Sequence, residues 1–285
     1  MTNHFAYTNL NFYNKVVENL AKISFFRRYR FIALSLLGIL LIYFLSNFIY
    51  SQIFKIVPET AYYFMPSIGF SGKEKRVLVF SPHPDDETLA SAGYIQAALA
   101  RGIEVKIVLV TDGNRRGKGE KRKIEFQKAM SHLGLENNNL AFLDYKDGYL
   151  KYSNQDDLVE VFSKIIIEFD PQVIIYPSRF DEHLDHRVVG LAIEKISKDH
   201  RQIHKFAYLT HFSGYPYPRK LAQDRFLMEP ASLFFRCQWF KFPLTDDQQS
   251  KKLEALKNYQ VSLSYPRESG YLFSFVRKNE LFCQE

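Results

Sequence analysis

The sequence predicts an α/β protein: a Rossmann-like, doubly wound and mainly parallel sheet, with an N-terminal transmembrane helix. From about Lys73 onward, short apolar runs alternate with longer segments of helical periodicity. The runs do not alternate between apolar and polar residues, so each strand should be buried on both faces, as in a parallel sheet covered by helices. Ahead of them lies one long uncharged apolar stretch, residues 31–50.

That stretch, FIALSLLGILLIYFLSNFIY, predicts one membrane-spanning helix, because about 20 such residues cross the hydrocarbon core of a bilayer. A buried core helix is the alternative, but its uniform hydrophobicity argues against that. A cleaved signal peptide fits poorly, because thirty residues precede the stretch and its end is aromatic. Arg27, Arg28 and Arg30 precede it, whereas only Lys55 follows within the next fifteen residues. The positive-inside rule therefore predicts a single-pass protein with a cytoplasmic N-terminus and an extracytoplasmic C-terminal domain.

We expect the chain to be organised in four segments. An aromatic-rich N-terminal segment, residues 1–30, should form a short cytoplasmic or interfacial helix. The transmembrane helix follows at residues 31–50, and residues 51–72 form a juxtamembrane linker. The remaining residues, 73–285, form one folded domain.

The overall charge and the cysteines exclude some classes of function. The net charge of +7 would suit nucleic acid or an anionic surface, but the basic residues are scattered, with clusters only at 27–30 and 115–123. The sequence carries no nucleic-acid-binding motif, so we expect no nucleic-acid partner. Cys237 and Cys283 are too few for a disulfide framework or a cysteine zinc site, and we expect two ordinary thiols.

The expected elements alternate along the folded domain. The apolar runs VLVF, VKIVLV, LAFL and VIIY, and a shorter one that begins at Phe206, are typical of buried strands. They cover residues 77–80, 105–110, 140–143, 173–176 and 206–209, and the helices expected between or after them cover 87–100, 120–133, 158–169 and 186–198. Beyond Gly214 the pattern weakens to one amphipathic helix at 246–259 and strands near 234–242 and 272–276.

Polar residues follow each of the first four expected strands. They are His83, Asp85 and Asp86 after the first, Thr111, Asp112 and Asn114 after the second, Asp144 and Asp147 after the third, and YPSRFDEHLDHR, 176–187, after the fourth. In open α/β sheets, ligands bind beyond the carboxyl ends of the strands. The sequence therefore predicts a polar site at this edge of the sheet.

The first and fourth loops together offer metal ligands. His83, Asp86, His183 and His186 supply imidazoles and a carboxylate, and a catalytic zinc site uses three protein ligands and an open position for water. A further carboxylate beside the metal would serve as a base. The alternative is structural: the histidines cap a helix, and the acidic residues 85–87 interact with the dipole of the helix that they begin.

The paired motifs PHPDDE, 82–87, and HLDH, 183–186, resemble the PIG-L/LmbE family of zinc-dependent de-N-acetylases. The resemblance covers roughly residues 76–200 and includes TDGNRRG, KRKIEFQKAMSHLGL and FLDYKDGYL. It implies an enzyme, a zinc-dependent amidohydrolase that removes an acetyl group from N-acetylglucosamine in a glycolipid or another amino-sugar conjugate.

The resemblance also implies roles for individual residues. The three metal ligands would be His83, Asp86 and His186. Asp85 matches the general base, His183 matches the histidine that stabilises the tetrahedral oxyanion, and Asp185 would orient a neighbouring imidazole. Two histidines and one carboxylate suit Zn²⁺ and also accept Fe²⁺.

Three residues are candidates for substrate contact. Arg122 and Glu125 match an arginine and a glutamate on the second helix of the family, although a solvated pair three residues apart on a helix is the alternative. Asp112, in the loop after the second expected strand, is the third candidate.

The sequence departs from the family pattern at two places. Leu184 replaces a proline between the first histidine and the aspartate of the second motif, which changes the stiffness of that loop more than its chemistry. The family's C-terminal helix often closes in a Ser-Gln pair, where this chain has Val261 and Ser262. No C-terminal substrate contact is therefore transferred to this chain.

Hydrolysis of an acetamide needs an activated water molecule, a base and a stabilised oxyanion. On this hypothesis zinc activates the water, Asp85 accepts its proton, and protonated His183 stabilises the oxyanion. An anchored domain suits a lipid-linked or envelope-associated amino sugar. Arg115, Arg116 and Lys118 would face an anionic group of the substrate or form a solvated loop.

Two other functions remain open from the sequence. A metal-dependent phosphoesterase would use a second metal, for which Asp112, Asp144 and Asp181 offer ligands. A membrane-tethered carbohydrate-binding module without turnover would have little need of a base beside the metal. The sequence identifies neither the substrate and acyl group, nor the native metal, nor the oligomeric state.

Overall fold

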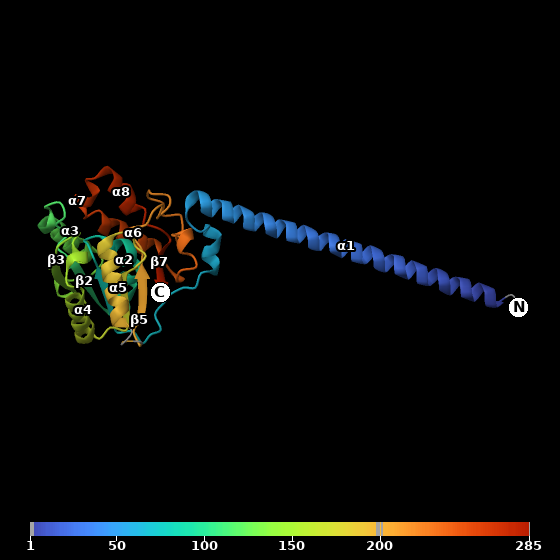
Figure 1. Ribbon diagram of the computed structural model, residues 1–285, viewed down its shortest axis with the longest axis horizontal. Coiled ribbons are helices and arrows are strands. Elements are labelled where there is room, and N and C mark those ends of the chain that lie inside the picture. The colour runs from blue at the N-terminus through green and yellow to red at the C-terminus, as the bar shows by residue number, and fades with distance from the viewer. Residues whose placement is uncertain (1–2, 198–199, 201, 285) are drawn as a thin grey trace. The chain divides into compact units, whose positions relative to one another are not determined.

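The computed structural model describes residues 3–197, 200 and 202–284, without the side chains of 3–16, 19–28, 197 and 267. The chain divides into two compact units, Met1–Tyr50 and Ser51–Glu285 (Figure 1). The four segment boundaries expected from the sequence remain predictions.

The N-terminal unit lies within one continuous helix, α1 (Asn3–Phe54), so the helix expected in residues 1–30 and the apolar helix after it are not separate elements. Its part Tyr29–Phe54 is long and apolar enough to span a membrane. The large apolar side chains of this part are exposed, for example Leu41 at 68% and Ile42 at 69%.

Seven strands form one sheet in the order β3-β2-β1-β4-β5-β7-β6. Their bounds are β1 (Arg76–Ser81), β2 (Glu104–Thr111), β3 (Leu140–Tyr145), β4 (Val173–Pro177), β5 (His204–Tyr208), β6 (Gln238–Pro243) and β7 (Asn279–Gln284). The first five strands are parallel, and β7 runs antiparallel to both of its neighbours. In the centre, Val77 of β1 pairs with Val105 of β2 and with Val173 of β4, and all three are buried. The predicted doubly wound, mainly parallel sheet is confirmed.

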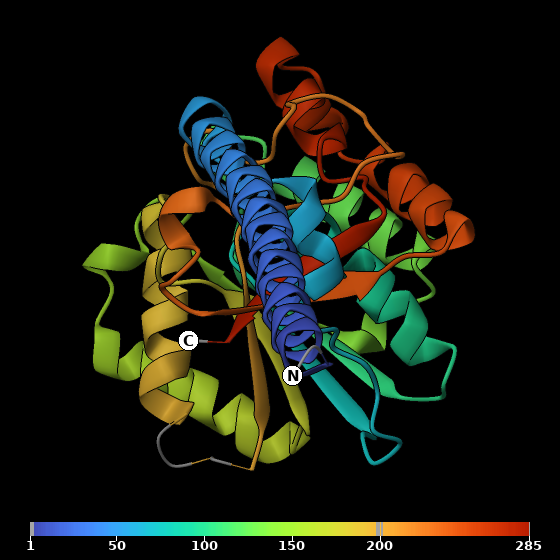
Figure 2. The ribbon, with the colours of Figure 1, turned by 90° about the vertical axis from the view of Figure 1, so that its right-hand side faces the viewer.

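Helices cover both faces of the sheet. They are α2 (Asp86–Leu99), α3 (Gly119–His132), α4 (Gln155–Phe169), α5 (Leu184–Ser197), α6 (Asp246–Leu256), α7 (Gln260–Leu263) and α8 (Pro266–Phe273). Figure 2 shows α4 and α5 on one side of the sheet and α2 and α3 on the other. The helix α4 illustrates the pattern: Leu158, Phe162 and Ile166 recur every four residues and are buried, and the Asn154 side chain accepts a hydrogen bond from the backbone N–H of Asp156 at its start.

The strand order also determines where a site can form. The chain leaves β1 toward β2 on one side, whereas β4 lies on the other side of β1 and leads to β5. The loops beyond the carboxyl ends of β1 and β4 therefore diverge and leave a crevice between them. Residues 82–87 and 178–186 lie in these two loops and at the helix starts that follow.

The C-terminal third differs from the sequence prediction. The helix expected at 246–259 ends at Leu256, and the strand expected at 272–276 is wrong because Leu272 lies in α8. The strand β7 was not predicted, since its polar residues resemble a loop. The structure shows why they fit a buried strand: Glu280 forms a buried ion pair with Lys252 (2.8 Å), and Asn279 exchanges hydrogen bonds with the backbone of Leu227.

The expectation of two free thiols is also wrong. Cys237, just before β6, and Cys283, in β7, form a disulfide with their Cα atoms 5.9 Å apart. The two strands pair along their length, and Trp239 lies opposite Cys283. The bridge therefore joins two chain segments that the sheet already brings together, which sequence spacing alone does not reveal.

The described residues also include four short 3-10 helices: η1 (Glu59–Phe64), η2 (Asn137–Asn139), η3 (Leu150–Tyr152) and η4 (Ala231–Leu233). The segment after α1 belongs to the C-terminal unit and packs on later parts of it. Ile56 pairs with Pro230, and the ring of Tyr62 stacks on Phe226 with centroids 3.7 Å apart.

Candidate active site

The corner between β1 and α2 separates two adjacent carboxylates. Asp85 has φ of +122°, a conformation that residues with a side chain rarely adopt and that costs about 1–3 kcal/mol. Its carboxylate accepts a hydrogen bond from Ser262 Oγ (2.9 Å). Asp86, the first residue of α2, points the other way, toward His83 and His186. The backbone turn thus gives neighbouring acids different partners.

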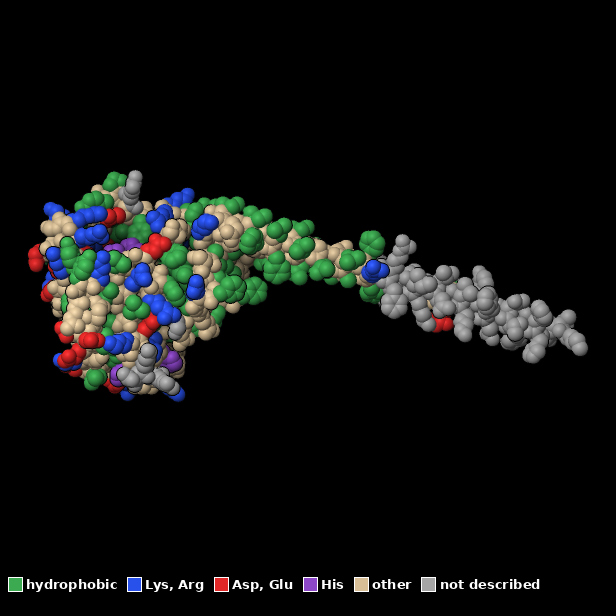
Figure 3. Space-filling model, in the orientation of Figure 1, with side chains coloured by type: hydrophobic (Ala, Val, Ile, Leu, Met, Phe, Trp, Pro, Cys, Tyr) green, Lys and Arg blue, Asp and Glu red, His purple; other side chains and the backbone are tan. Residues whose placement is uncertain are grey.

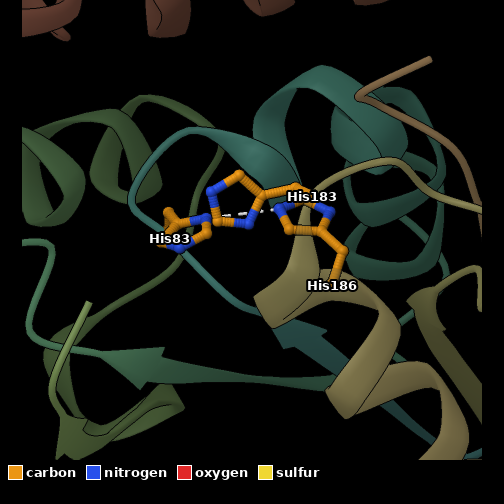
Figure 4. A group of neighbouring side chains, drawn as sticks. All are labelled: His83, His183 and His186. Atoms are coloured by element: carbon orange, nitrogen blue, oxygen red, sulfur yellow. Dashed lines mark hydrogen bonds between the residues drawn. The ribbon is translucent and has the colours of Figure 1, made fainter. Parts of the chain in front are cut away.

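His83, Asp86 and His186 converge on one point. The three distances are 3.2 Å between His83 Nδ1 and His186 Nε2, 3.3 Å between His83 Nδ1 and Asp86 Oδ2, and 3.0 Å between His186 Nε2 and Asp86 Oδ2. Tetrahedral ligands at the usual zinc distances of roughly 2.0–2.1 Å lie about 3.3–3.4 Å from one another. The three atoms therefore fit one face of such a tetrahedron. Figure 4 shows the imidazoles of His83, His183 and His186 side by side.

Carboxylates bind the outer ring nitrogens of both histidines. Asp181 Oδ2 lies 3.4 Å from His186 Nδ1, and His83 Nε2 lies 3.1 Å from Asp185 and 3.3 Å from Asp147. Metal-ligating histidines usually donate their second N–H to such a partner. With the outer nitrogens engaged in this way, His83 Nδ1 and His186 Nε2 are the nitrogens that face Asp86.

The electrostatics of the cluster favour a positive charge at its centre. Burial would lower the pKa of His186, but Asp86 and Asp181 raise it to about 9. Burial would raise the pKa of Asp86, but His186 and His83 hold it well below its usual value. A divalent cation would supply the same positive charge among these groups, so the donor set fits a metal in charge as well as in geometry.

Asp85 lies beside this cluster and is one of the residues that line a pocket, described below. Burial raises the pKa of Asp85 to about 7, with Arg122 acting against that rise and Asp86 adding to it. Arg122 Nη2 lies 3.5 Å from the carboxylate and donates to the carbonyl oxygen of Pro84 (2.9 Å). The arginine therefore holds both the backbone and the side chain of this corner.

His183, for which the sequence predicts a protonated ring beside the oxyanion, also lines the pocket. Burial and the neighbouring imidazoles of His83 and His186 lower the pKa of His183 to about 3, so the ring is neutral at pH 7. Its Nδ1 accepts a hydrogen bond from the backbone N–H of Asp185 (3.3 Å). The proton therefore resides on Nε2, which makes His183 a neutral N–H donor.

Asp185 contacts the imidazole of His83, in keeping with the orienting role expected for it. Its carboxylate also accepts hydrogen bonds from the backbone N–H groups of Gly148 (2.6 Å) and Leu150 (3.2 Å). Asp185 thus connects the start of α5 to the loop after β3.

The three residues expected to contact substrate occupy different positions. Arg122 is among the described residues that line the pocket, whereas Glu125 and Asp112 are not. Glu125 is buried and accepts a hydrogen bond from the backbone N–H of Val261 (3.1 Å). Asp112 accepts hydrogen bonds from the backbone N–H groups of Asn114 and Asp147, which orders the loop after β2.

The acids suggested as ligands for a second metal do not converge in the described structure. Asp144 is exposed and pairs with Lys123 (3.3 Å). Asp112 accepts a hydrogen bond within its own loop, and Asp181 lies 3.4 Å from Nδ1 of His186.

The sequence did not predict His211 or Ser262 at the site, nor the contact between Asp147 and His83 (3.3 Å). His211 Nε2 lies 3.9 Å from Asp86, and burial lowers the pKa of His211 to about 4. It follows β5, so the rule that polar residues after a strand mark the site would have found it had it been applied to the fifth strand. Ser262 carried no local signal, because it lies 177 residues from Asp85.

These residues line a pocket of about 440 Å³, a volume typical of small-molecule sites. Besides acids and imidazoles, five basic side chains line it: Arg115, Arg116, Lys118, Arg122 and Arg219. The guanidinium of Arg116 lies 4.0 Å above the ring of Tyr265 and pairs with Glu268 (3.1 Å). The lining thus combines carboxylates with basic and aromatic side chains.

The chain was compared with known proteins. Residues 78–197 match the family model PIG-L, described as GlcNAc-PI de-N-acetylase. A probable N-acetyl-alpha-D-glucosaminyl L-malate deacetylase 2 of Bacillus anthracis is 31% identical over 42% of this chain and 58% of its own length. A diacetylchitobiose deacetylase of Thermococcus kodakarensis is 31% identical over 43% of this chain and 49% of its own length.

Solved structures agree on the fold. An N,N'-diacetylchitobiose deacetylase from Pyrococcus horikoshii superposes with a TM-score of 0.50 at 20% identity, over 74% of this chain and 83% of its own. A deacetylase of the teicoplanin biosynthetic pathway gives a TM-score of 0.56 at 16% identity, over 73% and 97%.

The match spans 49–66% of the length of the curated relatives, so it concerns the domain rather than the whole proteins. Both motifs of the candidate site, 82–87 and 183–186, fall within the residues that the family model matches. Residues 78–197 of this chain therefore form a PIG-L family domain.

Proposed function

We propose that this protein is a metal-dependent deacetylase that hydrolyses the acetamide of an N-acetylglucosamine-type amino-sugar conjugate. One observation carries the proposal: the ligand atoms of His83, Asp86 and His186 lie 3.0–3.3 Å apart, and both His83 and a separate carboxylate, that of Asp85, line one pocket. The deacetylases named among the sequence relatives support this reaction class. No specific observation favours a phosphoesterase or a binding module.

His83, Asp86 and His186 would hold the metal, for which Zn²⁺ and Fe²⁺ both suit the donor set. When bound, such a metal supplies Lewis acidity, which makes a water molecule more acidic and polarises a carbonyl oxygen. Asp181, Asp185 and Asp147 keep the two imidazoles in the tautomers that ligation needs.

The chain's own groups would carry the protons. Asp85 takes a proton from the attacking water as the C–O bond forms, and returns it to the nitrogen as the C–N bond breaks. The second proton of the water stays on the new carboxyl group, so the step yields acetic acid and the free amine, which exchange one proton to become acetate and an ammonium ion, and atoms and charges balance. His183 donates its Nε2–H toward the carbonyl oxygen as negative charge develops there.

We further propose that α1 spans a membrane and that the catalytic unit is extracytoplasmic. The charge asymmetry around the apolar stretch supports this orientation. The disulfide between Cys237 and Cys283 supports it independently, because disulfides persist mainly in oxidising compartments.

A lipid-linked or envelope-associated substrate suits this arrangement. His211 and Arg219 line the pocket, and between them in the sequence Tyr217 packs on Phe54, the last residue of α1, with ring centroids 4.9 Å apart. One loop therefore joins the pocket to the end of the proposed span.

Amine release by the full-length, zinc-loaded protein tests the proposal, with N-acetylglucosamine conjugates of neutral, anionic and lipid type as substrates. Asp85→Asn is the matched control, since it preserves shape and removes the base. We expect the parent to release amine and the variant to be slower by roughly 10²–10⁴-fold. Equal rates would contradict the role of Asp85, and no release from any conjugate by metal-loaded parent would contradict the deacetylase proposal.

A further inference from the structure

Four aromatic side chains are exposed beside the end of α1. Tyr63 and Phe64, at the end of η1, are 73% and 85% exposed, and Phe234 and Phe235, just after η4, are 41% and 93% exposed. Figure 2 shows η1 (light blue) and η4 (orange) on the same face of the C-terminal unit, and hydrophobic side chains are visible along this edge in Figure 3. We call these four residues the aromatic face.

A short antiparallel bridge holds the two halves of the aromatic face together. The backbone N–H of Ala231 donates to Lys55 (2.9 Å), that of Val57 donates to Glu229 (3.0 Å), and Ile56 pairs with Pro230 between them. Lys55 directly follows the last residue of α1. The aromatic face is therefore fixed within a few residues of the point where the proposed span ends.

Exposed aromatic residues at this place suit the headgroup region of a bilayer. A group of large exposed apolar side chains usually marks an interaction surface, and aromatic rings are enriched where a membrane protein leaves the hydrocarbon core. The ring of Phe235 contacts that of Phe234, with centroids 4.7 Å apart, and is still 93% exposed, and the tether to α1 would hold it close to lipid.

The charges around the aromatic face favour anionic lipid. Lys55 and Arg236 are exposed, and Lys241 lies 4.0 Å from the ring of Tyr62. Glu59, the acid that begins η1, is already paired with Arg225. Basic side chains beside a membrane attract anionic headgroups.

From this juxtaposition we propose that the aromatic face docks the C-terminal unit on an anionic bilayer surface. The proposal rests on the membrane span proposed for α1, but not on the deacetylase reaction. Docking would orient the unit on the membrane instead of leaving it free to turn about its tether.

Tryptophan depth measurements on the full-length protein in vesicles test this. Phe64→Trp and Phe235→Trp place a reporter on the aromatic face, and Tyr152→Trp, at a position 71% exposed on η3, is the matched control. The parent corrects for the single native tryptophan, Trp239, which is buried. The vesicles contain phosphatidylcholine with brominated acyl chains and phosphatidylglycerol.

We expect bromolipid to quench Phe64→Trp and Phe235→Trp at least about twofold more than Tyr152→Trp, because side chains that dock reach the acyl boundary. Replacing phosphatidylglycerol by phosphatidylcholine should reduce that difference. Equal quenching at all three positions would overturn docking, and quenching independent of phosphatidylglycerol would overturn the preference for anionic lipid.

Flotation of the vesicles separates failure of the span from failure of docking. Protein that does not float with the vesicles would overturn the membrane span itself. Protein that floats without selective quenching would leave the span intact and overturn docking alone. Each variant should retain the activity of the parent, since neither Phe64 nor Phe235 lines the pocket among the described residues, and loss of activity would show misfolding.

Discussion

Asp85 and Asp86 are neighbours in the sequence, yet their carboxylates have different partners. Asp86 lies within 3.3 Å of His83 and His186, whereas Asp85 faces Ser262 and the pocket. The unusual backbone conformation of Asp85 is what separates them. One tight corner can therefore supply both carboxylates to which we assign separate roles, metal binding for Asp86 and proton transfer for Asp85.

This division of roles predicts opposite effects on metal content. Asp85→Asn should retain metal, because the side chain of residue 85 is not one of the three expected ligands, His83, Asp86 and His186. His186→Ala should bind metal much more weakly than the parent. The loss in affinity should exceed the roughly 10–100-fold that follows when a hydrogen-bond partner of a ligand is removed. Elemental analysis after equilibration at fixed free zinc measures both. A metal-free Asp85→Asn protein would contradict the assignment.

Asp181 allows a test of how a carboxylate beside an expected metal ligand affects metal affinity. Its carboxylate lies 3.4 Å from His186 Nδ1 and accepts hydrogen bonds from the backbone N–H groups of Thr210 and His211. Asp181→Asn should weaken zinc binding roughly 10–100-fold, because the ring loses its charged partner. Competition with a chromogenic chelator measures the affinity, and Asp144→Asn, at an exposed acid, is the control. Equal affinities for the two variants would contradict the role of Asp181.

Among the elements, β4 and α5 together determine the position of the second motif. Gly190 of α5 lies so close to the end of β4 that an added Cβ would be 2.6 Å from the carbonyl oxygen of Pro177. His183 lies just before this helix, and His186 lies in its first turn. Close packing of the helix on the strand end therefore sets the distance from His186 to the β1 corner.

Gly190→Ala should lower the free energy of unfolding by about 1–3 kcal/mol, because the added methyl group meets backbone that cannot move aside. The sign of this change in the free energy of unfolding is informative, since replacing glycine by alanine in a helix interior normally stabilises the helix by about 1 kcal/mol. Chemical denaturation in detergent measures it, with Leu191→Ala, 51% exposed, as the control. A more stable Gly190→Ala protein would show that α5 is free to shift.

At the scale of the whole molecule, several segments distant in the sequence assemble around buried polar groups. Glu229 is 1% exposed, and its Oε2 has no hydrogen-bond partner among the described residues. Burial raises the pKa of Glu229 to about 7. The folded protein therefore retains a proton on this group at pH values where the unfolded chain, with an ordinary glutamate pKa of about 4.3, has released it.

Stability should consequently fall as the pH rises from about 4.3 to about 7, and the loss is complete above that range. The difference in pKa corresponds to about 3–4 kcal/mol. Glu229→Gln should therefore be more stable than the parent by a few kcal/mol at pH 8, and the two should converge near pH 4.5.

Denaturation of both proteins at these two pH values isolates the contribution of Glu229, because all other groups titrate alike. Glu168→Gln, an exposed position on α4, should show no such difference. A gap between Glu229→Gln and the parent that does not change with pH would contradict the assignment.

Local patterns in the sequence were enough to predict part of this protein. Apolar runs without alternation predicted the parallel strands, and the polar residues after β1 and β4 predicted that His83, Asp86 and His186 lie together, because a parallel sheet brings the carboxyl ends of its strands to one edge. The length and lack of charge of residues 31–50 identified the apolar helix in the same way.

Contacts between segments that are distant in the sequence could be seen only in the tertiary structure. Ser262 donates a hydrogen bond to Asp85, from which it is separated by 177 residues in the sequence. Lys252 pairs with Glu280 and so allows the polar strand β7 to be buried, and Cys237 forms a disulfide with Cys283. The lowered pKa of His183 likewise arises from burial and from neighbouring imidazoles, among them that of His83 on another loop. Such pairings depend on the energy of burying polar groups together, and that energy exists only once the chain has folded.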